Sequence, residues 1–414
     1  MGMDNWPREN PDFYKINCSR EERIKLISNG LLEEEFYKYA NNFRESAHII
    51  TQDALDSQRI SVLDINFFGL AFLYRHSIEL ILKGIGFKYI LDTNGRKKFI
   101  KETFHNLYDI TNYISRYIDE FISYDRDAYE WVLEIFRDMN CIDKESDSFR
   151  YPFGIVKERK QYYFHEKEEY QTKLFFPEQT HINLFAFASK MEIIFSILDS
   201  YYNGEKIITN EYKQYSSAFL ETGGEYYCQS VIGYKYNGGD FHCNVKSYKN
   251  CADIILKSIN KDDSLKARLF MPFCYLYRNS IELIMKQILF EESSYNIQEA
   301  LEIMSDCKHK LYATWKAVKK DVILHSGKSD TDETLILVEK YIIKINEFDG
   351  KAARFRYPID KDLNLYYRRE KFVDFDNVRD FFEDVFTFFD CVCNMMSVQN
   401  EQQRVIEYEC YKYY

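Results

Sequence analysis

Two histidines stand at matching points of two similar stretches of the chain and could act in acid–base chemistry. His105 opens the stretch HNLYDI, and His309 opens the stretch HKLYATW. Histidine titrates near neutral pH, so a positioned histidine can take up or release the proton of a reacting group. The alternative is that each histidine begins a helix and is hydrogen-bonded across a helical bundle. The sequence leaves both interpretations open.

Charged side chains at steps of four residues form a second recurring pattern, inside otherwise apolar runs. Residues 72–83 read FLYRHSIELILK, and residues 275–286 read YLYRNSIELIMK. Each run places an Arg, a Glu and a Lys on one helix face, and these six residues are Arg75, Glu79, Lys83, Arg278, Glu282 and Lys286. The stripe is either a structural salt-bridge ladder or a means of directing the Arg into a cleft. The two runs differ in ionisable chemistry at one position, where His76 is replaced by Asn279.

The tetrapeptide FRYP also occurs twice, and it fixes an Arg beside a rigid turn. Proline holds the residue before it, Tyr151 or Tyr357, in an extended conformation and ends any preceding helix. The Arg of each tetrapeptide, Arg150 or Arg356, is then presented at a loop, where it could bind an anionic group such as phosphate. It could equally tie two helices together by binding a carboxylate such as Asp143 or its counterpart in the second stretch.

The order and spacing of these motifs indicate a tandem duplication. The Arg of the stripe recurs after 278 − 75 = 203 residues, the histidine after 309 − 105 = 204, and the Arg of FRYP after 356 − 150 = 206. Nearly constant offsets over this distance predict two domains of ordinary size. The predicted segments are an N-terminal extension (1–32), repeat 1 (33–205), a linker (206–242), repeat 2 (243–400) and a C-terminal tail (401–414).

Hydrophobic periodicity predicts that each repeat is a bundle of four or five helices. Apolar residues recur at helical spacing in several stretches, and only 15 Gly and 6 Pro occur in the chain, which favours long helices. The expected fold class is all-α, with two up-down bundles packed as an internal pseudo-dimer. Two local predictions are a helix from Ser19 with Glu22 completing a capping box, and a short hairpin at residues 236–239.

Composition argues against several classes of protein. The 414 residues carry a net charge of −11, which disfavours non-specific coating of nucleic acid but leaves room for a small basic cleft. No run of eighteen apolar residues and no N-terminal signal region occur, so we expect a cytoplasmic protein without membrane contact. The ten Cys and eight His show no metal-binding spacing, and nucleotide-loop and hydrolase motifs are missing, so neither a metal nor a cofactor is expected.

Together these residues resemble the HEPN superfamily of nucleotide-binding domains. The pattern of that superfamily is a helix with Glu and Lys four residues apart, then His-x-Leu opening a later helix, then an Arg-Tyr-Pro turn before the last helix. Both repeats match it in order. The matching residues are Glu79, Lys83, His105, Leu107, Arg150, Tyr151 and Pro152 in repeat 1, and Glu282, Lys286, His309, Leu311, Arg356, Tyr357 and Pro358 in repeat 2.

The resemblance implies that the two repeats pair, and that a metal-independent ribonuclease site, in active members, spans the pair. It implies a role in toxin–antitoxin or anti-phage defence, with RNA or a nucleotide as ligand and an antitoxin or defence component as a protein partner. Further homo-oligomerisation is open. The catalytic candidates are then His105, His309, His76 and Arg75. The phosphate-binding candidates are Arg150, Arg278, Arg356, Tyr151 and Tyr357, and the orienting residues are Glu79, Lys83, Glu282, Lys286 and Asn279.

Active HEPN ribonucleases usually carry an Arg followed, after four to six residues, by a His. Only Arg159 and His165 fit this spacing, which is a weak match, and in repeat 2 the position of His165 is taken by Arg369. The alternative function is therefore a non-catalytic interaction or sensor module whose polar stripe is structural. A functional site predicts that Arg75, His105 and Arg150 converge in one cleft, whereas a structural stripe predicts that carboxylates neutralise each Arg inside its own bundle.

Overall fold

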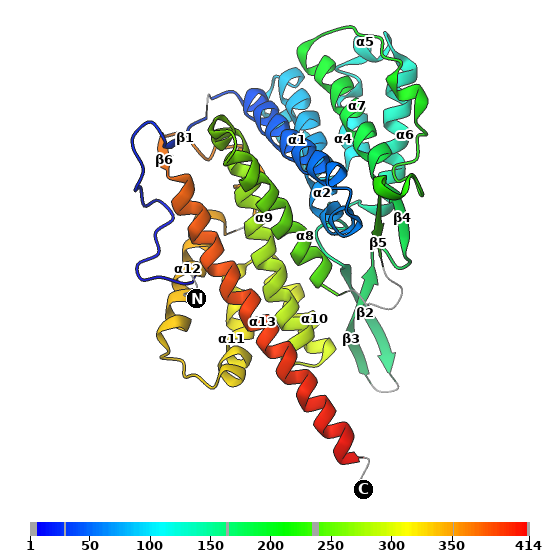
Figure 1. Ribbon diagram of the computed structural model, residues 1–414. Helices are drawn as coiled ribbons and strands as arrows, with labels where there is room; N and C mark the ends of the chain where they lie inside the picture. The colour runs from blue at the N-terminus through cyan, green and yellow to red at the C-terminus, as the bar shows by residue number, and fades with distance from the viewer. Residues whose placement is uncertain (1–5, 29, 163–164, 234–239, 351, 412–414) are drawn as a thin grey trace.

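The computed structural model describes residues 6–28, 30–162, 165–233, 240–350 and 352–411, and these residues are mostly helical (Figure 1). The helices of repeat 1 are α1 (Leu32–Asp56), α2 (Ile60–Tyr89), α3 (Thr93–Thr103), α4 (Leu107–Ser115), α5 (Asp119–Ile122), α6 (Arg126–Ile142) and α7 (Leu184–Asn203). Those that follow are α8 (His242–Ile259), α9 (Lys266–Gln287), α10 (Ile297–Cys307), α11 (Leu311–Ser326), α12 (Glu333–Asp349) and α13 (Phe375–Tyr411).

Three small antiparallel sheets of two strands each accompany the helices in the described part of the chain. Strand β1 (Ile24–Leu26) pairs with β6 (Lys371–Val373), β2 (Phe153–Tyr162) with β3 (His165–Leu174), and β4 (Thr180–Asn183) with β5 (Gln229–Ile232). The prediction of a mainly helical protein is confirmed. The all-α prediction holds in this coarser form only, because segments outside the helices form short strands that satisfy their backbone groups by pairing with one another.

Two backbone features recur at the offsets seen in the sequence. Phe104 and Lys308 end α3 and α10 with positive φ angles of 44° and 50°, and they are 308 − 104 = 204 residues apart. Ser146 and Ala352 have φ angles of 65° and 53° and are 352 − 146 = 206 residues apart. Positive φ is uncommon outside glycine, so its recurrence at these points shows that the two repeats share local geometry as well as motifs.

The central helices of the two repeats are almost entirely buried and lie beside the first helix of the other repeat. Helix α2 packs on α8, and α9 packs on α1 (Figure 1). Gly69 permits a close approach of α2 to α8, since a Cβ atom there would lie 2.6 Å from Cys251 Sγ. The Gly69 N–H also donates to Ser247 Oγ at 2.9 Å. The two repeats therefore share one continuous interface built by their central helices.

Helix α2 is long and apolar enough to cross a membrane by length and composition. In its most apolar window of 18 residues, however, 94% of the residues are buried inside the protein. A core helix passes the same test, and the packing of α2 against α1, α7 and α8 gives it that role.

Of the local predictions outside the bundles, the helix from Ser19 is wrong. The Ser19 N–H does bond to Glu22 Oε2 at 2.9 Å, but residues 19–28 contain no helix. Instead Ile24 and Leu26 alternate with an exposed Lys25, and β1 crosses to repeat 2, so tertiary pairing outweighs local helix propensity. The hairpin predicted at residues 236–239 lies outside the described residues. The predicted tail is helical as far as Tyr411, as the projecting end of α13 shows in Figure 1.

Candidate functional site

A buried carboxylate organises the first of two charge networks. We call this network site A, and it consists of Glu79, Lys83, His105, Arg356 and Tyr357. Glu79 Oε1 accepts hydrogen bonds from Lys83 Nζ and the Tyr357 hydroxyl, both at 2.7 Å, and lies 2.9 Å from His105 Nδ1. Arg75 donates to Oε2. Burial alone would raise the pKa of Glu79, but Lys83, His105 and Arg75 outweigh it and hold that pKa well below its usual range.

The second network repeats this arrangement around Glu282. We call it site B, and it consists of Glu282, Lys286, His309, Arg150 and Tyr151. Glu282 Oε1 accepts from Lys286 Nζ at 2.8 Å and from the Tyr151 hydroxyl at 2.5 Å, and His309 Nδ1 lies 3.0 Å away. Arg278 donates to Oε2. The duplication has therefore preserved the whole network as well as the sequence motifs.

Each network is completed by a tyrosine from the other repeat. Tyr357 follows α12 of repeat 2 but bonds to Glu79 of repeat 1, and Tyr151 makes the reciprocal contact with Glu282. The Lys of each stripe lies over the exchanged ring, with Lys83 Nζ 5.0 Å from the centroid of Tyr357. Arg75, His105 and Arg150 do not converge in one cleft, the arrangement expected of a functional site, because the extended FRYP segment carries Arg150 across to site B, where its Nη2 is 3.4 Å from His309 Nδ1.

Arg75 and Arg278 are structural in this geometry, which corrects their predicted roles in catalysis and phosphate binding. The Arg75 side chain is only 1% exposed and donates to Glu79, to Asp143 Oδ2 at 2.9 Å and to the backbone oxygen of His105. Arg278 bonds in the same way to Glu282 and to the backbone oxygen of His309. A buried guanidinium with these bonds is not accessible to a ligand. Its role is to hold the backbone of the histidine next to the buried carboxylate.

His76 does not have the surroundings of a catalytic residue. It is fully buried between Phe43 and Phe72, and its Nε2 lies 3.0 Å from the backbone oxygen of Arg356. Burial lowers the pKa of His76 to about 3, so the ring is neutral at physiological pH. The matching Asn279 is also fully buried. These positions fill the interface between repeats and are out of reach of a ligand.

The chain positions His105 by ending one helix and beginning the next on either side of it. Phe104 ends α3, and Asn106 caps α4 by accepting the Asp109 N–H at 3.2 Å. The turn directs the His105 ring onto Glu79 while leaving 35% of the side chain exposed. His309 lies between α10 and α11 with the same exposure. Each histidine side chain therefore contacts a buried carboxylate and is also partly exposed at the surface.

The electrostatics of site A favour a neutral histidine with a defined tautomer. Glu79 is the strongest single influence and raises the pKa of His105, but burial and the cations Lys83 and Arg356 together lower it below its usual value. Because a carboxylate accepts only, Nδ1 must carry the ring proton that faces Glu79. Nε2 is then the unprotonated nitrogen, as in the base of a carboxylate–histidine pair. Burial is the main cause that lowers the pKa of His309.

A cavity of about 760 Å³ opens over site A. Lys83, His105, Arg356 and Tyr357 contribute to its wall, together with Arg354. Its size lies within the usual range of about 300–1,000 Å³ for ligand pockets. Carboxylates also line it, but Asp349 accepts the N–H groups of Ala353 and Arg354, and Asp360 accepts those of Asp362 and Asn364. Glu347 and Asp362 line the cavity as well, so its wall carries both carboxylates and the cations Lys83, Arg354, Arg356 and Lys361.

The two sites differ in the residue that faces the FRYP arginine. In site B, Asp147 Oδ1 lies 3.2 Å from Arg150 Nη1 and neutralises it. The corresponding residue of repeat 2, at 147 + 206 = 353, is Ala353. Among the described residues, Arg356 has no ion pair within 4 Å, and its Nε donates to the backbone oxygen of Ala352 at 2.6 Å. Next to Ala353, Arg354 replaces Ser148 and adds a further cation to the wall of the cavity over site A.

The pair Arg159 and His165 lies apart from both networks. Both residues belong to the β2–β3 hairpin, in which Arg159 is opposite Glu168 and His165 opposite Tyr162. The Arg159 side chain is 77% exposed and lies 3.5 Å from Glu168. The weak match to the catalytic spacing therefore falls on an exposed, ion-paired Arg of a two-stranded hairpin.

Sequence reasoning identified the carboxylates, lysines, histidines and FRYP residues but missed the contribution of Arg354 and the effect of Ala353. The signal was present, since the aligned segments NCIDKESDSFRYP and NEFDGKAARFRYP replace Asp-Ser by Ala-Arg. No group of three or more His, Cys, Asp or Glu side chains in the described part of the chain is arranged to hold a metal ion. Comparison with protein-family models, with curated proteins and with solved structures found no match.

Proposed function

We propose that site A binds a phosphate group of RNA and cleaves the adjacent phosphodiester without a metal ion. The observation that carries this proposal is the juxtaposition, in one cavity, of a carboxylate-oriented histidine and an arginine that has no ion pair within 4 Å among the described residues. His105 and Arg356 come from different repeats and both line the cavity of about 760 Å³. The neutral histidine suits acid–base catalysis, and the guanidinium suits the charge of a phosphate.

Each residue of site A has a separate role in the proposed reaction. His105 Nε2 takes the proton of a ribose 2′-hydroxyl, the 2′-oxygen bonds to phosphorus, and the P–O5′ bond breaks. Water supplies the proton that the departing 5′-oxygen takes up. Arg356 stabilises the negative charge that develops on the phosphate oxygens. Glu79 and Tyr357 hold the tautomer and orientation of His105, through contacts of 2.9 and 3.1 Å to Nδ1.

The overall organisation that fits this reaction is a pair of HEPN-like bundles fused in one chain. The recurring helix order, the shared positive φ angles and the exchanged tyrosines support a pseudo-dimer with sites between its halves. We place such a protein in the cytoplasm, in a defence or toxin role, where an antitoxin-like partner would restrain it. Because the two repeats are fused, each is present at a high effective concentration for the other. The tyrosine contacts between repeats therefore form within a single chain.

A non-catalytic role is the second candidate, and site B favours it. Asp147 neutralises Arg150 there, so the site has the same architecture as site A without an available arginine. If site A served the same structural purpose, the networks would only fasten the repeats together. Such a protein would bind a partner or a ligand without cleaving RNA.

Cleavage of RNA in the presence of EDTA tests the proposal. The wild type should yield fragments that end in 2′,3′-cyclic phosphate, and His105→Ala should lower the rate by about 100-fold or more, the usual contribution of a general base. His309→Ala is the matched control and should retain most of the activity. A wild type that leaves RNA intact, or a His105→Ala variant as active as the wild type, would overturn the proposal. Equal melting temperatures of the two variants would separate lost chemistry from lost folding.

A further inference from the structure

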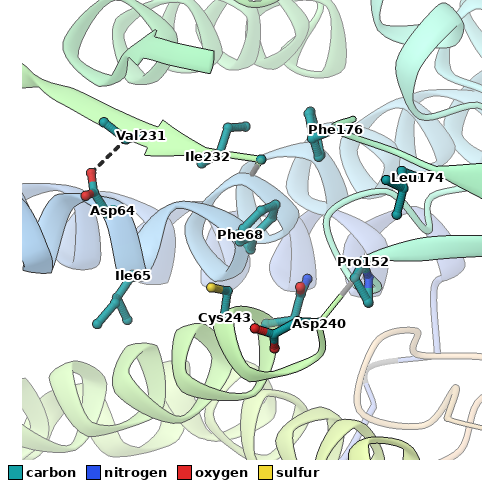
Figure 2. A pocket seen from close by; sticks show the side chains of 12 residues that line it. Asp64, Ile65, Phe68, Pro152, Leu174, Phe176, Val231, Ile232, Asp240 and Cys243 are labelled. Atoms are coloured by element: carbon teal, nitrogen blue, oxygen red, sulfur yellow. Dashed lines mark hydrogen bonds between the residues drawn. The ribbon is translucent and has the colours of Figure 1, made fainter. Parts of the chain in front are cut away.

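A second, smaller cavity lies at the junction of the two repeats and is independent of site A. It is formed by one side of α2, the end of β5, the first turn of α8 and Pro152 of the first FRYP segment (Figure 2). We call it the Phe68 pocket, and the residues that matter for its chemistry are Asp64, Phe68, Phe176, Asp240, Cys243 and Asn244. Its volume of about 120 Å³ is close to the cavity of about 150 Å³ that holds benzene in an engineered protein.

The wall of this pocket combines aromatic rings with two carboxylates. The rings of Phe68 and Phe176 lie 5.8 Å apart at 58°. Figure 2 shows Asp64 and Asp240 on opposite sides of Phe68, with Cys243 below the ring. Burial raises the pKa of the Cys243 thiol, and the charges of Asp240 and Asp64 raise it further, so both carboxylates act on the space between them. None of the described residues that line the pocket is Lys, Arg or His.

Both carboxylates are fixed by the backbone through one oxygen. Asp64 Oδ1 accepts the Val231 N–H at 2.7 Å, the dashed line in Figure 2, and Asp240 Oδ1 accepts the His242 N–H at 2.5 Å. Within the described part of the chain, no hydrogen bond to Oδ2 of either carboxylate is seen, so Oδ2 can accept from a further donor. Burial raises the pKa of Asp64, which means that its negative charge is poorly solvated and would gain from a nearby cation.

Asn244 gives an independent sign that a ligand is missing from the pocket. Its side chain is 2% exposed and lines the cavity, and its amide nitrogen has no hydrogen-bond partner among the described residues. A buried polar group without a partner costs about 1–3 kcal/mol, so one that lines a cavity calls for an occupant. Rotation of the amide by half a turn exchanges its nitrogen and oxygen, so Asn244 can accept from an ammonium as well as donate.

We propose that the Phe68 pocket binds a small organic cation, namely an apolar amine of about the size of benzylamine. The aromatic faces of Phe68 and Phe176 accommodate both the apolar body and the positive charge. Asp64 and Asp240 supply the opposite charge, and Asn244 supplies a further hydrogen bond. The same two carboxylates repel an anion of equal size. This inference does not depend on the reaction proposed for site A.

Ligand-observed NMR with benzylamine, benzyl alcohol and benzoate tests this assignment on the full-length protein. Benzylamine should bind, benzyl alcohol should bind at least tenfold more weakly, and benzoate should not bind. Asp64→Asn should weaken benzylamine binding about tenfold or more, the share of a charged hydrogen bond, and leave benzyl alcohol unchanged. This variant retains the Oδ1 acceptor for Val231, so its melting temperature should stay near that of the wild type.

A second variant covers the possibility that Asp64→Asn disturbs folding. Asn244→Leu removes an unpartnered amide, so it should keep or raise the melting temperature while it lowers benzylamine affinity. Failure of the wild type to bind benzylamine would overturn the proposal, and so would equal binding of benzylamine and benzyl alcohol. Activity of site A toward RNA should be the same with or without benzylamine, which keeps the two proposals separable.

Discussion

Sites A and B share a carboxylate, a lysine, a histidine and an exchanged tyrosine, yet they differ in the charge around the FRYP arginine. In site B, Asp147 binds Arg150, whereas in site A the same place is taken by Ala353 and Arg356 faces the cavity. The common part is buried and holds the repeats together. The sites differ at the FRYP arginine and the residue that faces it, which lie at the edge of each network. A duplicated domain can therefore keep its architecture in both copies and alter the chemistry of one.

The shared architecture gives the largest expected effect. Glu79→Gln and Glu282→Gln should each destabilise the protein by roughly 3–5 kcal/mol, because a buried Arg and Lys lose their common partner. The loss should be greater in site B, since Arg75 keeps a contact of 2.9 Å to Asp143 whereas Arg278 Nε lies 3.6 Å from Asp349. Urea unfolding of both variants measures the difference. Losses below about 1 kcal/mol would show that the networks are not what fastens the repeats.

Exchanging the residues that distinguish the two sites tests whether this difference determines RNA cleavage. Ala353→Asp should give Arg356 a counterion and lower RNA cleavage about 10- to 100-fold, the share of a charged hydrogen bond to phosphate. Asp147→Ala, the reciprocal change in site B, should leave cleavage unaltered. The assay is the EDTA reaction at matched protein concentrations. If Ala353→Asp cleaves at the wild-type rate, Arg356 has no part in the reaction.

His76 and Asn279 allow a test of acid sensitivity. The pKa of His76 is about 3 in the folded protein, against an ordinary value of 6.5, so between these values the unfolded chain binds more protons. Stability therefore falls as the pH is lowered through this window, and His76 alone should cost about 2–3 kcal/mol between pH 7 and pH 4.5. His76→Asn should abolish the part of the acid-induced loss of stability that comes from His76.

Melting temperatures at the two pH values check the prediction, with His242→Asn as a control at an exposed position. A His76→Asn variant that is as acid-sensitive as the wild type would contradict it. His105 and His309 also have lowered pKa values, so a smaller dependence in the same direction should persist in the variant.

The helices and the members of each network were predictable because they follow from local rules. Spacing of four residues put Glu79 beside Lys83, and the apolar runs marked the buried helices. The partner of each FRYP segment was not predictable, because its tyrosine meets a residue 131 positions away in one site and 278 in the other. Repeat 1 could have closed its own site or that of repeat 2 with the same motifs. The pairing of β1 with β6 was missed for the same reason.

The exchange of tyrosines between repeats can be tested on the histidines themselves. Nitrogen-15 NMR of the imidazole rings at pH 7 should show His105 as a neutral ring that carries its proton on Nδ1. Tyr357→Phe removes the hydroxyl that lies 3.1 Å from Nδ1 and should shift the His105 resonances, while Tyr151→Phe should leave them in place and shift those of His309. The opposite pattern, in which Tyr151→Phe moves His105, would mean that each repeat closes its own site.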